Sequence, residues 1–554
     1  MNMELQEVGK YIVEPFALER ILDLEYVKTI NDHARLYVRG VLKEGEEDSL
    51  IGQQWDAMPV KLTQAGDTLF CGVATDVGVI CESGVYYLEA EAVSWTVKLD
   101  QTEKKRSFQE KGRGYDSIVN EIAGEAGGSA TCVAPAKQIE NLLLQYRETD
   151  WEFLKRLASH SNSVLVPDPT QETPVFSFGL SEGNSYSQET AKADFSVRKK
   201  VARYRQLSQC EEISYQEEDA VEYSIRTEFA ALEIGDQVSV KGKSLYVREV
   251  RLSLKGSVFL CTCVATTKQG ISAAKIDHPY ISGLTLDGKV LNVSNHTVKV
   301  HLSIDKSQDE GKAYPFPYAT GYSTEGNTGW YVMPEVGDTV QIIFPTEDEN
   351  KAYAVQSVRQ AETDRTADPN VKYLRTVDGK EIKMDKDEIL ITAQDWLTYV
   401  RINKDSGVDV FTIKDVNVLS AGSITLLSGN DISMACLNDF NVTVGKDMKV
   451  NVKGTIDITN KENNLHMDPK KGISMSADQA IQISTENTMD IASKKKFTAG
   501  SKDEMDISSV KNLNISSRKK MIWTASKSLQ ENCKGSAICI DGNVTMKARL
   551  IKEN

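Results

Sequence analysis

Residue types that carry out catalysis are dispersed along this chain instead of being grouped. No Gly-x-Ser-x-Gly, phosphate-loop or His-Glu-x-x-His motif occurs. The nine cysteines include no Cys-x-x-Cys pair. No His-x-His pair occurs among the histidines, which are His33, His160, His278, His296, His301 and His466. We therefore expect no catalytic centre, cofactor or metal site, and interpret each histidine as a surface or packed residue.

Close carboxylates and paired thiols also have structural explanations. The chain holds 80 Asp and Glu residues, so neighbouring carboxylates arise by chance. We interpret Glu148, Asp150 and Glu152 as the acidic start of a helix and not as an acid–base pair. Cys261 and Cys263 are two residues apart in an apolar run, which places both on one face of a strand. Reduced core thiols are the simplest interpretation.

The charge balance excludes a class of partners. The formal net charge is −15 and the sequence pI is about 5.2. Such a chain repels nucleic acid and anionic membranes, because binding to phosphates needs a basic face. Short basic runs at residues 104–106, 494–496 and 518–520 are interpreted as solvated surface patches. We expect no nucleic-acid partner.

Length and segment types predict several domains and synthesis in the cytoplasm. The 554 residues exceed what one core organises. The first residues show no basic segment followed by an apolar run, so no signal peptide is expected. No stretch of about 18 apolar residues is present, so no transmembrane helix is expected. Any exit from the cell would need machinery other than the general secretory route.

The elements that position these residues are mainly β. Residues 1–275 are predicted to mix strands with a few helices. Residues 86–95 alternate like a half-buried strand, and strands are expected near 244–250 and 257–264. A helix is predicted from about Tyr115. A second is predicted after Thr149, which has capping-box spacing to Glu152.

Residues 279–360 are predicted to form a small closed β-barrel. Strands are expected at 288–293, 297–303, 329–333, 339–345 and 352–358, separated by turn residues. Gly337 is expected to supply a positive-φ turn after Pro334, and Asp338 a turn hydrogen bond. The polar stretch 361–375 is predicted to be a linker.

Residues 376–554 are predicted to be a repetitive β-structure with a period of eight. Pairs of the form apolar–x–apolar recur every eight residues, and the phase slips by one residue after Ile458, within 460–464. An i, i+2 pair places two side chains on one strand face. The predicted interior positions are Val408, Val410, Val416, Val418, Ile424, Leu426, Ile432, Met434, Ile456, Ile458, Ile473, Met475, Ile481, Ile483, Met489, Ile491, Met505, Ile507, Leu513 and Ile515.

One octad buries too few side chains to be stable alone, so octads must stack. Three octads of one chain could form a rung of a single-chain β-helix. Alternatively, three identical chains could intertwine, each supplying one side. The period alone leaves both arrangements open.

The order of these parts resembles the VgrG-type spike proteins of contractile injection systems, which include type VI secretion spikes and phage tail hubs. Residues 145–157, QYRETDWEFLKRL, resemble a stretch shared by that family. Residues 288–290 and 298–300 resemble the opening strands of its OB-fold barrel. Residues 330–340, WYVMPEVGDTV, resemble its Pro-Glu-x-Gly-Asp-x-Val signature.

This resemblance implies a homotrimer with a hub ring, an OB-fold collar and a triple-stranded β-helix needle. It implies contacts with tail tube and baseplate proteins, a PAAR-type protein on the needle tip, and delivery into a target envelope by sheath contraction. Tip docking is expected at Ile538, Ile540, Val544 and Met546. No further domain is expected after the last octad, so effector cargo would come from partners.

The sequence departs from the family in three respects. Gly422, Gly429 and Gly454 are scattered, whereas phage needles often hold glycine at a fixed octad position. The stretch after residue 360 is too short for the lysozyme domain of some phages, and the His-x-His iron site of some tips is missing. The alternative interpretation is a single-chain β-helix that binds or degrades polysaccharide, but the residues outside the pairs are mostly Ser, Thr, Asn, Asp and Lys.

Overall fold

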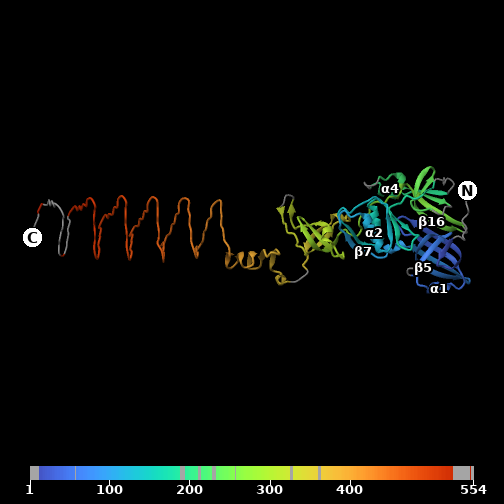
Figure 1. Ribbon diagram of the computed structural model, residues 1–554, viewed down its shortest axis with the longest axis horizontal. Coiled ribbons are helices and arrows are strands. Elements are labelled where there is room, and N and C mark those ends of the chain that lie inside the picture. The colour runs from blue at the N-terminus through green and yellow to red at the C-terminus, as the bar shows by residue number, and fades with distance from the viewer. Residues whose placement is uncertain are drawn as a thin grey trace. The chain divides into compact units, whose positions relative to one another are not determined.

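A computed structural model describes most of the chain, which is mainly β (Figure 1). The described residues are 11–55, 58–186, 194–209, 214–227, 232–255, 258–324, 328–359, 363–527, 534 and 549–550. The chain divides into two units, residues 1–419 and 420–554, each described here by itself. None of the described helices is long and apolar enough to cross a membrane.

The first region of the chain, which we call the hub, is built on one large sheet in the order β1-β4-β5-β6-β3-β2-β16-β17-β14-β13, with β15 paired to β16 and β12 paired to β15. Its strands alternate buried and exposed residues, so one side chain in two enters the core. The bounds are β1 Tyr11–Glu14, β2 Leu18–Thr29, β3 Arg35–Leu42, β4 Pro59–Gln64, β5 Asp67–Glu82, β6 Val85–Ser94, β12 Ser185–Tyr186, β13 Phe195–Lys199, β14 Val221–Thr227, β15 Gln237–Val240, β16 Lys243–Lys255 and β17 Val258–Thr266. The strands predicted at 86–95, 244–250 and 257–264 correspond to β6, β16 and β17.

A second layer of the hub carries the two predicted helices. Helix α2 spans Tyr115–Glu125 and α3 spans Asp150–Ser159, and their apolar faces share one core. Beside them lie β8 (Ser129–Cys132), β10 (Leu165–Asp168) and β11 (Val175–Phe178) in one small sheet, and β7 (Lys104–Phe108) paired with β9 (Leu143–Glu148). Shorter helices are α1 Glu47–Gly52, α4 Val201–Leu207 and α5 Lys268–Ile271.

The predicted barrel contains five strands in the order β20-β19-β18-β23-β24. Their bounds are β18 Leu284–Ser294, β19 Thr297–Leu302, β20 Pro315–Pro317, β23 Thr339–Phe344 and β24 Tyr353–Ser357. A parallel bridge between Tyr318 and Ala354 joins the two ends of this order and closes it.

One predicted barrel strand was wrong. Residues 330–333 form no strand, and their neighbours β21 (Ser323–Thr324) and β22 (Thr328–Gly329) pair only with each other. The fifth strand is β20, which the two prolines had concealed, since proline cannot donate to a ladder. Strand β20 lies at one end of the strand order and pairs with β19, and proline is tolerated in such an edge strand.

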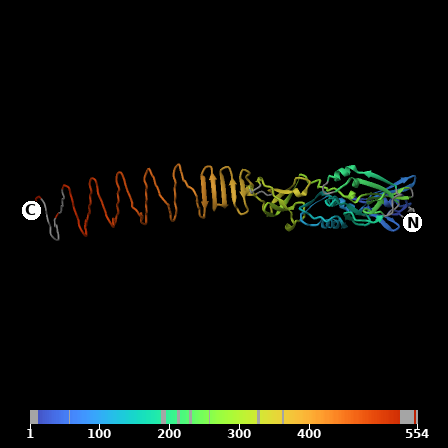
Figure 2. The ribbon, with the colours of Figure 1, turned by 90° about the horizontal axis from the view of Figure 1, so that it is seen from above.

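An antiparallel meander follows the barrel. It runs β25 (Lys372–Arg375), β26 (Glu381–Met384), β27 (Glu388–Gln394), β28 (Thr398–Asn403) and β29 (Gly407–Thr412), each paired with the next (Figure 2). The predicted linker, 361–375, therefore ends in a strand. The first octad pair, Val408 and Val410, lies in β29, so the first part of the predicted repeat region is a sheet of paired strands.

The octads after residue 412 form a regular coil of extended segments and bends (Figures 1 and 2). Six-residue extended segments alternate with two-residue bends, for example at 421–422, 429–430 and 437–438. The bend at 461–463 is one residue longer, at the position of the phase slip. Within 413–527, no segment pairs with another as strands do. The predicted tip positions Ile538, Ile540, Val544 and Met546 lie outside the described residues.

Candidate functional site

Strand β9 belongs to two cores at once. Successive side chains of a strand point to opposite faces. Leu143 therefore packs with α2 and α3 in the hub core, whereas Leu144 packs with the strands of the barrel. Leu142, just before the strand, also enters the barrel core. The hub and the barrel thus share a strand and pack directly on each other; we call this region the hub–barrel junction.

A buried ion network crosses the hub–barrel junction at Arg156, which is 1% exposed. Its Nε donates to Glu148 Oε1 at 2.8 Å, and its Nη1 donates to Glu349 Oε1 of the barrel at 2.9 Å. Arg156 Nη2 also donates to the Leu144 carbonyl at 2.6 Å, while the Leu144 amide donates to Glu349 at 3.1 Å. A planar guanidinium suits this role, because it can serve several acceptors in one plane.

Burial raises the pKa of Glu148, although its contact with Arg156 favours the charged form. A buried carboxylate without a partner would be costly, so the arginine is what makes the charge tolerable. The sequence identified Arg156 only as part of the 145–157 resemblance. The interpretation of Glu148 as part of a helix start was wrong, because Glu148 ends β9 and pairs with Arg156, whereas α3 begins at Asp150. Glu349 carried no signal, because it lies 193 residues from Arg156 along the chain.

A second network surrounds the start of α3. Asp150 accepts from Arg106 Nη2 at 2.8 Å and from Gln145 Nε2 at 3.0 Å, and lies 2.6 Å from Lys104 Nζ. The predicted capping box is confirmed: Thr149 accepts from the Glu152 amide, and Glu152 accepts from the Thr149 amide. The interpretation of residues 104–106 as a solvated patch was wrong, because Arg106 and Lys104 neutralise Asp150, which is nearly buried.

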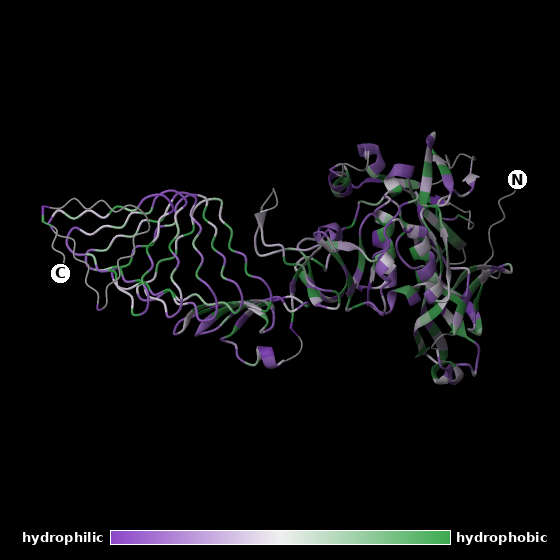
Figure 3. Cartoon of the chain, turned by 60° about the vertical axis from the view of Figure 1, so that its left-hand side comes forward, coloured by the Kyte–Doolittle hydropathy of each residue, from purple (hydrophilic) through white to green (hydrophobic). Residues whose placement is uncertain are grey.

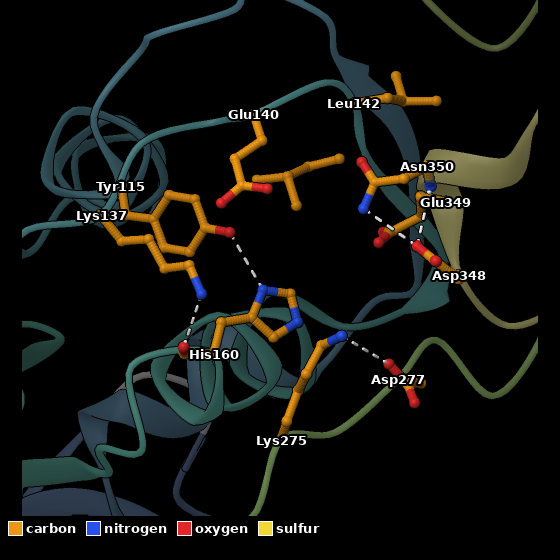
Figure 4. Close-up of a pocket in the computed structure, with 11 residues that line it drawn as sticks. Tyr115, Lys137, Glu140, Leu142, His160, Lys275, Asp277, Asp348, Glu349 and Asn350 are labelled. Atoms are coloured by element: carbon orange, nitrogen blue, oxygen red, sulfur yellow. Dashed lines mark hydrogen bonds and ion pairs between the residues drawn. The ribbon is translucent and has the colours of Figure 1, made fainter. Parts of the chain in front are cut away.

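A pocket opens beside the hub–barrel junction (Figure 4). At the end of α3, the Nδ1 atom of His160 lies 3.1 Å from the Tyr115 hydroxyl oxygen and shares a hydrogen bond with it. The His160 carbonyl accepts a hydrogen bond from Lys137. The remaining lining mixes acids and bases, including Glu140, Lys275, Asp277, Asp348 and Asn350. Lys275 pairs with Asp277 at 3.2 Å, and the acids of the lining outnumber its two lysines, so the pocket disfavours an anionic ligand.

Two buried histidines are held neutral near this pocket. Burial and the nearby Arg156 charge lower the pKa of His160 to about 3. The same two causes lower the pKa of His278, which is completely buried, to about 3. His278 Nε2 lies 3.3 Å from Glu148 Oε2, so a third group of the hub–barrel junction approaches the carboxylate of Glu148.

We expect His160→Gln to reduce the acid sensitivity of the protein. The folded pKa lies below the ordinary value near 6.5, so the folded state binds fewer protons than the unfolded state. The neutral imidazole therefore has no effect on stability above about pH 6.5. As the pH falls from there toward 3, the unfolded state gains a proton that the folded state does not, and the free energy of unfolding decreases. At about pH 5 one such histidine destabilises the fold by about 2 kcal/mol. Urea denaturation at neutral pH and about pH 5 measures this, with exposed His466→Gln as the control; equal pH dependence of both variants would contradict it.

The barrel turn predicted at residues 334–338 has a defined geometry. Gly337 has a φ of 95°, and its amide donates to the Val290 carbonyl at 2.9 Å. The Asp338 carboxylate accepts from the Glu335 amide at 2.9 Å. Pro334 precedes this loop and takes no part in these hydrogen bonds. The turn therefore ties the loop before β23 to β18.

Gly337→Ala should lower the stability of the barrel by about 1 kcal/mol. No atom would lie within 4 Å of an added Cβ, so the cost is the left-handed backbone conformation and not a clash. Thermal melting of the full chain is the measurement. Gly321→Ala is the control, since that glycine also has open space around it and no positive φ. An equal loss for both variants would show that backbone conformation is not the cause.

The meander presents one largely apolar face, interrupted on β25 by Lys372, which lies opposite Met384. Directly opposed residues on paired strands point to the same side. One row across all five strands is Leu374, Ile382, Ile391, Val400 and Val410. The adjacent row contains Met384, Ile389, Ile402 and Val408. Together these nine residues are the apolar sheet face.

The opposite side of the meander is polar and aromatic. Its rows include Arg375 and Glu381, which pair at 2.9 Å, and Tyr399 stacked on Phe411. This is the composition of a face in water. The apolar sheet face, in contrast, is left largely exposed by the described residues of the chain; Val408 and Val410 are 65% and 63% exposed.

The octad pairs repeat the apolar pattern in the later part of the sequence. The predicted interior positions after β29 are all exposed, for example Ile481 at 52% and Ile483 at 65%. Apolar segments recur along each turn of the coil (Figure 3). So many aliphatic side chains in regular order, left exposed to water, are not stable in a soluble protein and mark an interface.

Thiols and metal ligands form no second site in the part of the chain that is described. Cys261 and Cys263 are buried and free, and burial raises the pKa of each to about 12. Among the described residues, no group of three or more His, Cys, Asp or Glu side chains is arranged to hold a metal ion.

Comparisons with known proteins find a match for part of the chain. Residues 36–177 match the phage tail baseplate hub (GPD) family. No curated protein matches the sequence. Similar solved structures include an E. coli component of the type VI secretion system, 15% identical, with 63% of this chain and 100% of that chain covered and a TM-score of 0.46.

Two others are a Francisella PdpA–VgrG complex and a tail protein of prophage MuSo2 from Shewanella oneidensis. The first is 11% identical, with 70% of this chain and 76% of that chain covered and a TM-score of 0.43. The second is 10% identical, with 45% and 95% covered and a TM-score of 0.35. The predicted resemblance to hub-and-spike proteins is confirmed, because residues 145–157, which carried it most strongly, lie inside the segment that matches the baseplate hub family.

Proposed function

We propose that this protein is the homotrimeric spike of a contractile injection apparatus. Its hub joins the tail tube and baseplate, its barrel is an OB-fold collar, and its octads form a three-chain β-helix needle. The needle would carry a PAAR-type tip protein and effector cargo into a target envelope. The role is mechanical and not enzymatic.

The apolar sheet face and the octad pairs support this proposal most directly. Both need a cover, and the described residues of one chain supply none. Three copies related by a threefold axis would bury these faces against one another in one continuous interior. The match of residues 36–177 to a baseplate hub family supports the position of the hub at the tail end.

A single-chain β-helix that binds polysaccharide is less consistent with the chain. That fold requires backbone pairing between stacked segments of the same chain. In residues 413–527 the extended segments are not paired with each other. Hydrogen-bond partners from two other chains would fill this requirement, and would leave no long free strand edge.

The mass of the full chain in solution tests the proposal. Light scattering should give three times the chain mass of 61.4 kDa, and the particle should resist denaturant because intertwined chains unfold together. A well-folded monomer would contradict the spike and restore the single-chain β-helix.

A further inference from the structure

Basic residues occupy every described bend in the last part of the octad coil. Between residues 421 and 493 the bends are mixed: three carry no charge, four carry a lysine, and those at 478–479 and 486–487 carry only an acid. The five described bends from residue 494 onward each carry at least one lysine or arginine. These residues are Lys494, Lys495, Lys502, Lys511, Arg518, Lys519 and Lys527. We call residues 494–527 the basic band.

The net charge reverses at the start of the basic band. Residues 421–493 hold six Lys and Arg against nine Asp and Glu, a net charge of −3. Residues 494–527 hold nine Lys and Arg against three Asp and Glu, a net charge of +6. The three acids, Asp503, Glu504 and Asp506, all precede residue 507. The last 21 residues of the basic band therefore contain no acidic residue.

These cations have no internal partners among the described residues. No ion pair joins any lysine or arginine of the basic band to a carboxylate there, and every described residue of the band is exposed. The contrast with residues 104–106 is informative, because Arg106 and Lys104 of that run neutralise Asp150. The three acids of the basic band could neutralise at most a third of its positive charges.

Local hydrogen bonds fix the bends at which many of these charges stand. Ser493, Ser509 and Ser517 each stand just before a bend and donate to the carbonyl three residues later, at 2.8 to 3.0 Å. Bonds of this kind fix a turn without using the side chains at its apex. In the proposed shaft the apolar pairs of the extended segments would face the axis, and the bends with their lysines and arginines would form the outer corners.

We propose that the basic band binds the phosphate-bearing surface of an anionic lipid bilayer. This inference rests on the proposed function, because assembly of the shaft places the corners on its outside and triples their charge. Each level of the basic band then presents cations on all sides. A shaft that passes through a head-group layer meets phosphates on all sides as well, which is the arrangement this band fits.

The strong negative charge of the whole chain does not oppose this contact. At physiological salt, charges farther away than about 8 Å are largely screened. A bilayer surface at the basic band therefore senses the local charge of +6 per chain and not the total of −15. Lysine and arginine near an anionic bilayer each strengthen binding about fivefold.

Sedimentation of the full-length protein with lipid vesicles tests the proposal. At physiological salt the protein should bind vesicles of mixed phosphatidylcholine and phosphatidylglycerol, and should not bind pure phosphatidylcholine. The triple variant R518Q/K519Q/K520Q removes nine positive charges from the trimer and should bind the anionic vesicles at least about a hundredfold more weakly. High salt should release the wild-type protein.

The matched control is K446Q/K449Q/K453Q, which removes the same charge from earlier octads and should bind like wild type. Equal loss in both triple variants, or no binding by the wild-type protein, would overturn the proposal. Tighter binding to duplex DNA than to the anionic vesicles would overturn it in favour of a nucleic-acid partner. Light scattering on the same samples separates the two hypotheses: a trimer that ignores anionic lipid refutes only the lipid contact, whereas a monomer refutes the proposed spike.

Discussion

Replacing Arg156 with methionine is expected to lower the free energy of unfolding by about 3–5 kcal/mol. Methionine fills much of the arginine volume but supplies no charge or donor. Glu148 and Glu349 would then remain buried at the hub–barrel junction without the guanidinium that bonds them both. Two unpaired carboxylates close together must take up protons or move into water, and either response weakens the packing of the barrel on the hub. Chemical denaturation at neutral pH is the measurement.

Two further variants make this result specific. Arg113→Met removes an arginine paired with Glu121 near the surface, and should cost less than about 1 kcal/mol. The triple variant E148Q/R156M/E349Q removes all three charges and should recover part of the loss, because no buried carboxylate is left. A loss of less than 1 kcal/mol for R156M would show that the network contributes little.

Ile481→Asp is expected to abolish the trimer. In the proposed shaft three copies of residue 481 meet around the axis, so the substitution buries three like charges without partners, at a cost of several kcal/mol each. Such a cost applies only after assembly, since Ile481 of the single chain is 52% exposed. Light scattering should show a change from three chains to one, and resistance to denaturant should fall with it.

Gln482→Asp is the matched control, because it places the same charge one residue away, where the side chain points to the other face. It should leave the trimer intact. An I481D protein that remains trimeric would refute the register in which the apolar pairs face the axis.

Features that depend on the spacing of residues close together in the chain could be predicted from the sequence. The capping box at Thr149 and Glu152, the helices after Tyr115 and Thr149, and the recurrence every eight residues all depend on neighbours within one turn or one octad. Local hydrogen bonds and periodic side-chain direction are properties of short segments, so a sequence displays them directly.

Features that depend on distant partners could not be predicted. Glu349 meets Arg156 only after the barrel has docked on the hub, and nothing around residue 349 indicates a buried anion. Residues 104–106 looked like a surface patch for the same reason, since Asp150 lies more than forty residues later. Strand β20 was missed because its prolines weaken the strand pattern, while residues 330–333 were taken for a strand because they are apolar. The tip positions 538–546 lie outside the described residues and stay a prediction.

In the proposed spike, strand β9 has a consequence for how load would pass through the chain. A thrust along a spike must pass from one domain to the next without bending at the joint, and flexible linkers are where such columns fail. Here the two domains share a strand, with Leu143 wedged into one core and Leu144 into the other. Compression would press both cores against the same backbone instead of opening a hinge. The hub and barrel should therefore respond to axial force as one stiff strut, and yield by unfolding together before they tilt.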